Sequence, residues 1–502
     1  MAERWGEGTR IAWWHPRSLL HLTYKIQRLV TSRFTTRRGL ALATLGLFLA
    51  TPILAPSYER QPPHYGDLKS RCQALRGSEG ENQSGCANPG NEKVYISVSL
   101  FDPGGHLVNG EWGKSVLELI HLIGDDNVFL SIYENAGGRA EEAALENFEN
   151  KLRCRHALVH DQDDALLRAI PSIKLPDGST RLKRIAYLSE IRNRALRPLD
   201  TFSQGDMVYD KILFLNDIVF HPIDAAHLLF NTNVGADGKT HYIAACGLDY
   251  FTPFLYYDTF ALRDVEGYST GFAMFPIFTT AGHGLSRAAM LAGTDAVPVD
   301  SCWGGIVAMK AKYVQHVQKT LPADDFWEIG HHVIDPVSPI NATLPVRFRY
   351  EPEVFYDACE CCLFIADVSQ AARGDEDVLV ADMGVYMNPY VRVAYTHHVF
   401  FWMRWVQRWE RLLTIPQYIL SKVSGMPYHN PHRAVQGGDT FIEEIWTGEG
   451  KHGHWERVER LARNGMFCGE RKMLTIKAEG KHAGNSYWES LEIPGGQTLR
   501  FG

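Results

Sequence analysis

Hydrophobic residues along this chain gather in short runs, and the runs alternate with segments in which apolar residues recur at helical spacing. Apolar runs with the length of buried strands lie at 94–100, 128–133, 212–220, 242–246 and 304–309. Helical spacing is found at 112–123, 140–152, 184–196 and 223–230. Strands that alternate with helices predict an α/β fold, with a mostly parallel central sheet covered on both faces.

Two longer stretches lack this periodicity. Glycines punctuate the segment 265–298, where we expect a long mobile connection. Residues 401–502 are rich in Trp, His and Arg but contain few periodic runs, so we treat them as a carboxyl-terminal extension of unknown role.

The amino-terminal part of the chain predicts a membrane anchor. Residues 39–58 contain no charge, and twenty helical residues span roughly 30 Å, the thickness of a bilayer core. The preceding residues 1–38 hold eight Lys or Arg against two Glu, which favours a cytosolic tail. We expect a single-pass type II protein with a polar stem over 59–92 and a luminal body. A signal peptide cleaved near Ala55 is the alternative, but its charged region would be unusually long.

Charge and cysteine content limit the partners and the compartment. The net charge is −7 and the basic tail carries +6, so the remaining residues carry −13, which argues against nucleic-acid binding. Nine cysteines leave at least one thiol unpaired in a monomer. Cys72 and Cys86 flank a polar stretch and could close a small loop, whereas we expect Cys246 and Cys302 to be buried thiols. The cluster at 359, 361 and 362 lacks a second set of ligands for zinc, so we expect disulfide bonding or burial there. Asn82 and Asn341 start glycan acceptor patterns, which suit a lumen.

The most informative residue is an acid that interrupts an apolar run. Ile212–Leu215 are apolar, Asn216 and Asp217 follow, and hydrophobic residues then resume. A buried strand cannot hold an ionised carboxylate without a partner, and open α/β sheets bind ligands at the carboxyl ends of their strands. A divalent cation is one partner for Asp217, and capping of the next helix is the alternative.

Six segments resemble, in order, those of the fungal capsule-associated α-1,3-mannosyltransferases, glycosyltransferase family 69: 192–199, 214–220, 246–250, 257–264, 301–305 and 360–363. The resemblance implies a GT-A type nucleotide-sugar-binding domain over 93–400, GDP-mannose as donor and an α-mannoside as acceptor. It also implies a divalent metal, Mn²⁺ or Mg²⁺, and retention of anomeric configuration. The usual Asp-x-Asp motif is replaced by Leu215-Asn-Asp217, so pyrophosphate oxygens and water must complete the coordination.

Within this resemblance Asp217 is the expected metal ligand, and His397 is a further candidate because some GT-A enzymes take a carboxyl-terminal ligand. Arg192, Asn193 and Asn216 are candidates for donor binding, since guanidinium and amide groups hold phosphate, base or ribose. The alternatives are a surface ion pair of Arg192 with Glu190 or Asp200, and a turn-forming role for Asn216.

The reaction also needs carboxylates near the sugar. The acids that could face it are Asp249, Asp258, Asp264, Asp300 and Glu360, and each could instead be a structural hydrogen-bond partner. We select Asp258 and Glu360 as the catalytic candidates. Trp303, Gly304 and Gly305 could form an acceptor platform, or a core residue followed by a bulge.

The leading hypothesis is therefore a Golgi-membrane mannosyltransferase that makes an α-1,3 link in a cell-surface or capsular glycan. Two alternatives stay open: a non-catalytic scaffold or export factor for capsule polysaccharide, and a transferase that uses another donor such as UDP-xylose.

Overall fold

A computed structural model describes residues 37–74, 84–161, 167, 169–175, 177–200, 208–315, 344–448, 453–477 and 488–501. The chain divides into two compact units, 1–56 and 57–502. In the first unit, helix α2 covers Arg37–Leu54. Within the described residues, no helix combines the length and the apolar character that crossing a bilayer requires. The anchor expected over 39–58 therefore stays a prediction, and both glycan acceptor asparagines lie outside the described residues.

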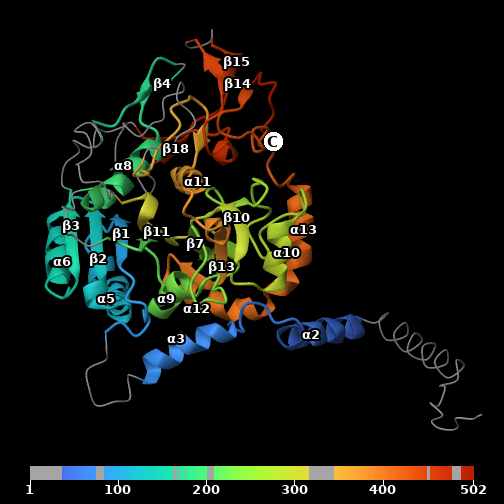
Figure 1. The fold of residues 1–502 in the computed structure, drawn as a ribbon. Coiled ribbons are helices and arrows are strands. Elements are labelled where there is room, and N and C mark those ends of the chain that lie inside the picture. Colours follow the sequence, from blue (N-terminus) through green and yellow to red (C-terminus); the bar gives the residue numbers. More distant parts are fainter. Residues whose placement is uncertain are drawn as a thin grey trace, which may run out of the picture. The chain divides into compact units, whose positions relative to one another are not determined.

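The second unit is built on a ten-stranded sheet with the strand order β3-β2-β1-β6-β11-β7-β13-β10-β9, in which β8 also pairs with β7 (Figure 1). Its strands are β1 (Val94–Leu100), β2 (Val128–Glu134), β3 (Arg155–His160), β6 (Lys211–Leu215), β7 (Ala244–Thr252), β8 (Leu255–Tyr256), β9 (Arg263–Asp264), β10 (Val297–Ser301), β11 (Ile306–Lys310) and β13 (Val385–Ala394). Strands β3, β2, β1 and β6 are parallel neighbours, and β7 is parallel to β13. Strand β11 runs antiparallel between β6 and β7. The predicted α/β class with a mostly parallel sheet is confirmed.

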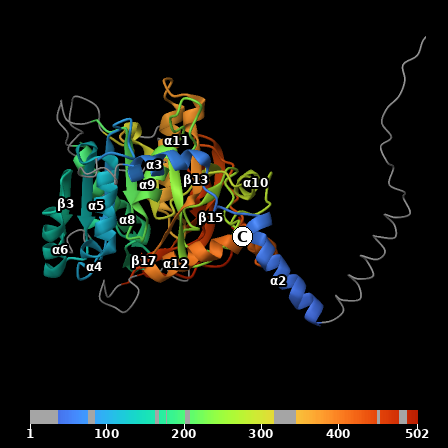
Figure 2. The ribbon, with the colours of Figure 1, turned by 90° about the horizontal axis from the view of Figure 1, so that it is seen from below.

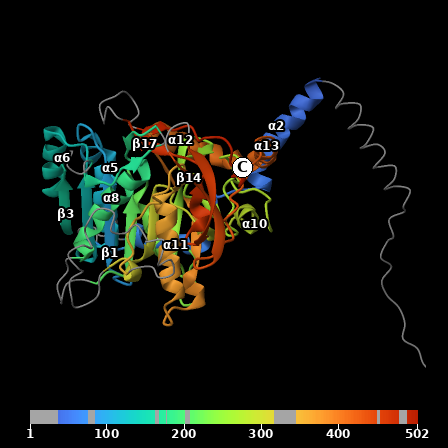
Figure 3. The same cartoon turned by 90° about the horizontal axis from the view of Figure 1, so that it is seen from above.

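Helices cover both faces of this sheet, because its central strands are apolar on both sides. Leu213 and Leu215 of β6 pack in one core with α5 and α9, while Ile212 and Phe214 belong to a second core that includes α11. All three views place β3 and α6 at one end of the sheet and α10 at the other (Figures 1, 2 and 3). The helices are α3 (Pro63–Ala74), α4 (His106–Asn109), α5 (Glu111–Ile123), α6 (Arg139–Glu149), α8 (Arg184–Leu196), α9 (Pro222–Asn231), α10 (Leu285–Ala292), α11 (Glu360–Arg373), α12 (His397–Val406) and α13 (Thr414–Val423). Short 3-10 turns are η1 (Asp125–Asn127), η2 (Arg197–Asp200), η3 (Ala311–Tyr313), η5 (Val380–Met383), η6 (Gln407–Leu413) and η8 (Met466–Cys468).

Two segments are more ordered than their composition indicated. The expected stem contains α3, whose Tyr65 and Leu68 are buried, and Tyr65 stacks on His227 of α9. The glycine-rich segment 265–298, which we expected to be mobile, contains α10 and the start of β10. Buried Phe275 and Phe278 hold it in the core. Apolar residues between the glycines, rather than the glycines, decided its structure.

Disulfides join distant parts of the second unit. Cys72–Cys86 forms as predicted. Cys246 and Cys302 were expected as buried thiols, but they form a disulfide because β7 and the segment before β11 are neighbours in the sheet. Cys362 pairs with Cys468 across 106 residues. Among the described cysteines, Cys154, Cys359 and Cys361 remain as buried thiols.

Residues 401–502 are integral to the second unit. Arg392 of β13 forms a two-pronged ion pair with Glu410, and Arg463 pairs with Glu351 at 2.8 Å. The smaller strands, most of them carboxyl-terminal, are β4 (Ile173–Lys174), β5 (Thr180–Arg181), β12 (Asp357–Ala358), β14 (Thr440–Thr447), β15 (His454–Leu461), β16 (Gly469–Glu470), β17 (Leu474–Ile476) and β18 (Trp488–Ser490). The carboxyl-terminal region also contributes to a cavity at the edge of the main sheet.

Candidate functional site

A cavity of about 570 Å³ lies at the carboxyl ends of the sheet strands; we call it the central pocket. Leu100 ends β1, Asn135 follows β2, Asp217 lies just beyond β6, and Tyr395 follows β13, and all of them line this cavity. Ligands bind at this edge in open α/β sheets because the strand ends and the following loops converge there. The pocket brings together most of the residues that the sequence singled out.

Asp217 lies at the mouth of the central pocket and is not a helix cap. Helix α9 begins at Pro222 with His221 as its N-cap, which excludes the capping alternative. The Asp217 side chain is solvent-accessible, yet the surrounding walls desolvate its carboxyl group and raise its pKa. Within the described part of the chain, this carboxylate forms no ion pair with another residue. It is therefore available to a ligand.

Asn216 is held by two tryptophans. The indole N–H of Trp112 donates to the Asn216 carbonyl oxygen at 3.0 Å, and the indole N–H of Trp303 lies 3.5 Å from its side-chain oxygen. The Asn216 N–H donates to the carbonyl oxygen of Gly305 at 3.0 Å. These contacts fix the turn that follows β6, and so fix the direction of Asp217.

Arg192 of α8 and Glu360 of α11 form a buried ion pair in the wall of the pocket, with Nε and Oε1 3.2 Å apart. The guanidinium also lies over the ring of Trp303, 4.8 Å from its centroid. Burial acts to lower the pKa of Arg192, but Cys361 and Glu360 outweigh it and raise the pKa above its ordinary value. The expected alternative partners of Arg192 are engaged elsewhere, because Glu190 pairs with Arg194 and Asp200 with Arg347.

Asp249 and Asp258 form a second acidic pair, in which Asp258 lines the pocket and Asp249 lies buried behind it. The Asp258 N–H donates to Asp249 Oδ1 at 3.1 Å, and the Tyr395 hydroxyl donates to Asp249 Oδ2 at 3.0 Å. Burial, followed by repulsion from Asp258, raises the pKa of Asp249 to about 7. Burial also raises the pKa of Asp258. Two close carboxyls cannot both ionise easily, so this pair retains a proton near neutral pH.

Gly304 and Gly305 have backbone conformations that favour glycine. Both have positive φ, and a Cβ on Gly304 would lie 2.1 Å from the carbonyl oxygen of Gly247. Gly304 donates its N–H to the Asp258 carboxylate, as Ala261 does at 3.0 Å. Trp303 is 98% buried beneath Arg192, so its ring cannot serve as an open sugar platform. This geometry favours the alternative of a core residue followed by a tight backbone turn, and these residues orient Asp258 and Arg192.

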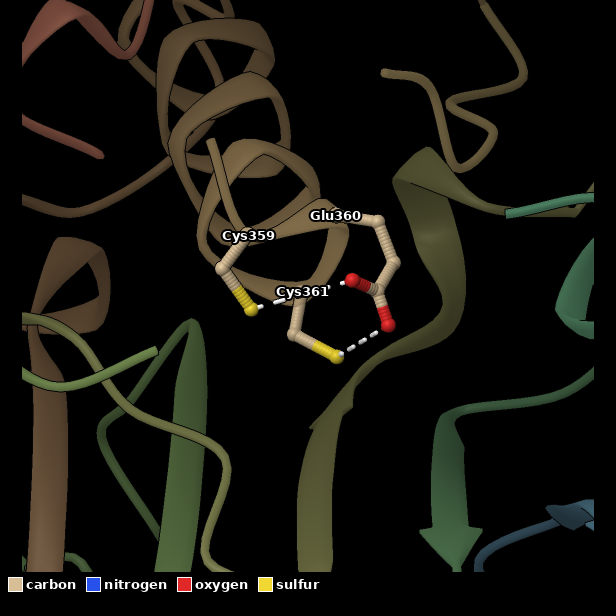
Figure 4. Close-up of side chains that lie close together, drawn as sticks. All are labelled: Cys359, Glu360 and Cys361. Atoms are coloured by element: carbon tan, nitrogen blue, oxygen red, sulfur yellow. Dashed lines mark hydrogen bonds between the residues drawn. The ribbon is translucent and has the colours of Figure 1, made fainter. Parts of the chain in front are cut away.

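Two thiols flank Glu360 at the start of α11 (Figure 4). Cys359 Sγ is 3.8 Å from Glu360 Oε2, and Cys361 Sγ is 3.5 Å from Oε1. Within the described residues this is the one cluster of three potential ligand atoms, all within 4.8 Å of one another. Sulfur ligands suit Zn²⁺ rather than Mn²⁺, and Glu360 is already paired with Arg192. The cluster is therefore not the hard-metal site that the sequence predicted.

Several predicted residues lie outside the central pocket. The Asn193 side chain donates to the carbonyl oxygen of Phe348 and accepts from its N–H, both at 2.8 Å, so its amide is occupied in holding α8. His397 is exposed at the start of α12 and does not line the pocket. Asp264 and Asp300 lie on β9 and β10, also away from it. The structure therefore does not bring these four residues into the central pocket, and the roles predicted for Asn193 and His397 find no support in its geometry.

The structure also adds residues that sequence reasoning missed. Tyr395 follows an apolar run, as Asp217 does, so its position at a strand end was a usable signal. Lys472, Ile476 and Trp488 come from the carboxyl-terminal region and complete the pocket wall. Arg184 of α8 stacks over Trp488 at 5.4 Å. No local signal connects these last residues to Asp217 and Asp258, which lie more than 200 residues earlier.

The family model described as cryptococcal mannosyltransferase 1 matches residues 93–367. The chain belongs to this family. Accordingly, it is a glycosyltransferase of the mannosyltransferase type. Arg192, Asp217, Asp258 and Glu360 all lie within the matched residues.

Similarity to individual known proteins is low. A search of curated proteins found no match. Among solved structures, one similar chain is the mannosyltransferase PcManGT from Pyrobaculum calidifontis in complex with GDP-Man and Mn²⁺. That chain has 11% identity, a TM-score of 0.30 and 74% coverage of both chains. The function is therefore inferred from the family and from the central pocket.

Proposed function

We propose that this protein transfers mannose from GDP-mannose to an α-mannoside acceptor in a reaction that depends on a divalent metal. The observation that carries the proposal is the position of Asp217. Its carboxylate has no ion-pair partner among the described residues, lies at the carboxyl edge of the sheet, and opens into a pocket that also contains Arg192 and two further acids. The family match supports mannose as the transferred sugar. The charged residues of the pocket support a charged nucleotide-sugar donor.

The residues present fit a hard divalent cation. Asp217 offers an oxygen ligand of the kind that Mn²⁺ and Mg²⁺ prefer, and the phosphate oxygens of the donor would supply others. When bound, the metal would stabilise the negative charge on the departing diphosphate. His397 is exposed and does not line the pocket, so it is not included in the set that we propose.

Basic residues of the pocket complement the donor. The Arg192 Nε–H donates to Glu360, and the planar guanidinium retains further N–H donors that can bind phosphate oxygens. Lys472 lies in the same wall and adds a flexible positive charge. Stacking on Trp303 holds the guanidinium in place, so less conformational entropy is lost when a donor binds.

Asp258 is the residue that we propose to accept the proton of the acceptor hydroxyl. Two backbone N–H groups fix its carboxylate, and burial, followed by repulsion from Glu360, raises its pKa. A base with a raised pKa accepts a proton more readily near neutral pH. Glu360 then acts as a positioning residue, because it holds Arg192 toward the pocket.

The finer features are proposals carried by the family resemblance: the GT-A type of the fold, an α-1,3 linkage with retention, a capsular or cell-surface acceptor, and a Golgi location with a luminal body.

One assay tests the reaction itself. Full-length protein in detergent is supplied with Mn²⁺, an α-mannoside, and either GDP-mannose or UDP-xylose. We expect transfer from GDP-mannose that stops when the metal is chelated. If only UDP-xylose supported turnover, the assigned donor would change from GDP-mannose to UDP-xylose. No turnover with either, in protein that still supports glycan export in cells, would identify a scaffold.

A further inference from the structure

A surface on the carboxyl-terminal helices is apolar where a soluble protein is normally polar. We call it the aromatic face, and define it as the exposed large apolar residues of α12, η6 and α13. These are Phe401, Trp402, Trp405, Ile415, Tyr418, Ile419, Leu420 and Val423. Phe401, Ile415 and Val423 are 69%, 70% and 80% exposed. Exposed apolar side chains that gather on elements packed against one another are typical of a binding surface.

Helix α13 has an inverted pattern. Its buried residues are the polar Gln417 and Ser421, and its apolar residues point outward. Gln417 hydrogen bonds to Arg287 of α10 at 2.8 Å, and Ser421 accepts from the N–H of Phe272 at 2.9 Å. Figures 1 and 3 both show α13 beside α10. Because these bonds fix the inner side of the helix, its apolar side cannot turn inward.

Tryptophans and basic residues share this surface. Rings of Trp402, Trp405 and Trp409 follow one another at 6.0 and 4.4 Å between centroids. Residues 401–423 contain four basic side chains and one acid, a net of +3 in a chain whose net charge is −7. The acid, Glu410, is buried against Arg392, so the outward charge is positive. Trp and Tyr with flanking Arg and Lys are typical of surfaces at the boundary between a membrane and water.

The chain itself enters the second unit at this surface. The Ser57 hydroxyl donates to Glu410 of η6, and Glu59 pairs with Arg408 of the same turn at 3.1 Å. Tyr58 between them is 98% buried and donates to the carbonyl oxygen of Met290 at 2.8 Å. Residues 39–56, immediately before this point, carry no charge. The second unit therefore begins beside η6.

We infer that the aromatic face rests on the surface of a phospholipid bilayer. Apolar side chains would enter the headgroup region, while Arg404, Arg408 and Lys422 would reach phosphates from the same elements. This inference does not depend on the proposed reaction, because the aromatic face and the central pocket share none of their residues.

Hydrogen exchange with the full chain tests it. Backbone amides of 397–423 are compared in detergent-free protein with and without vesicles, using either neutral phosphatidylcholine or a mixture that contains phosphatidylserine. We expect exchange there to slow by about tenfold or more on vesicles. The slowing should be larger on the anionic mixture and should weaken with added salt. Equal exchange with and without vesicles would overturn the inference.

Two variants test whether the protection on vesicles comes from the aromatic face or from another part of the chain. Phe401→Ser/Trp405→Ser/Ile419→Ser should lose the protection on vesicles, whereas Leu379→Ser/Val380→Ser should keep it. Leu379 and Val380 are a matched control because they are 65% and 85% exposed on another part of the surface. Protection of 401–423 that increases with protein concentration in the absence of lipid would assign the face to a second copy, and would also overturn the inference. The wild-type comparison decides the question even if the triple variant fails to fold.

Discussion

Arg192 and Glu360 are separated by 168 residues, yet their side chains meet at 3.2 Å in the wall of the central pocket. One residue comes from α8 and the other from the first turn of α11, so this contact fixes two covering helices at the site. The guanidinium is placed between a carboxylate and an indole ring, which leaves its other edge for a donor.

Removing one member of this pair should harm stability and activity together. Glu360→Gln leaves a buried cation without its counter-charge, which costs on the order of 3–5 kcal/mol in the free energy of unfolding. Arg192→Met/Glu360→Met should recover most of that stability because neither charge remains buried, but it should not recover transfer. Denaturant unfolding and initial rates of both variants measure this separation. Equal activity of the double variant and the wild type would contradict the assigned roles.

Loss of Asp217 should affect the metal and not the fold. We expect Asp217→Asn to lower kcat by about a hundredfold or more, as removal of one preorganised charge-stabilising group does. The melting temperature should not fall, because the carboxylate has no ion-pair partner among the described residues and desolvation disfavours its charge. Calorimetric titration of Mn²⁺ in the presence of GDP should show weaker binding. Asp377→Asn, at an exposed site away from the pocket, is the control.

Asp249 should make stability fall as pH rises. Its pKa is raised from 3.8 to about 7, so between these values the folded state binds more protons than the unfolded state. The free energy of unfolding therefore decreases through this window, by about 2–4 kcal/mol from this group. Asp249→Asn should flatten that dependence, measured by denaturant unfolding at pH 5 and pH 8. An unchanged slope would show that Asp249 is ionised throughout.

The Cys362–Cys468 disulfide should be important for both stability and the site. It closes a long loop and lies two residues from Glu360. Cys468→Ser should lower the free energy of unfolding by about 4–5 kcal/mol, the value for a loop of roughly 100 residues. Cys154→Ser, which changes an unbonded buried thiol, should have a much smaller effect on thermal unfolding. Comparable losses would mean that the disulfide adds little.

Lys472 tests the contribution of the carboxyl-terminal region. We expect Lys472→Ala to raise KM for GDP-mannose about tenfold, equivalent to about 1.4 kcal/mol, with a smaller effect on kcat. Lys472→Arg should retain part of the affinity because the charge remains. Lys151→Ala, at an exposed site outside the pocket, should leave steady-state kinetics unchanged. An unchanged KM in Lys472→Ala would remove this residue from the donor site.

The order of strands and helices was predictable because it depends on local patterns. The predicted segments 94–100 and 184–196 coincide with β1 and α8. Prediction was weaker where an apolar run continued past a turn: the run 212–220 gives strand β6 only over Lys211–Leu215. Asn216 ends the pairing there, with its backbone N–H bonded to Gly305.

Within the site, the sequence could supply single residues but not their partners. Asp217 was found because an acid after an apolar strand is conspicuous without any contact information. Trp303 and Asn193 show the opposite case. Each has a side chain that suits sugar or nucleotide binding, but Trp303 is buried in the core and the Asn193 amide is hydrogen bonded to Phe348. Burial depends on what packs on a side chain, and that information is distributed over distant segments.

By itself, then, the sequence determined the α/β class, the sheet edge that carries Asp217, the Cys72–Cys86 loop and the family. Only the tertiary structure decided that Arg192 faces Glu360, that Asp249 lies behind Asp258, and that Lys472 and Trp488 complete the pocket. Local patterns record whether a residue is apolar or polar relative to its near neighbours. Contacts across hundreds of residues are set by the packing of the whole sheet and its helices.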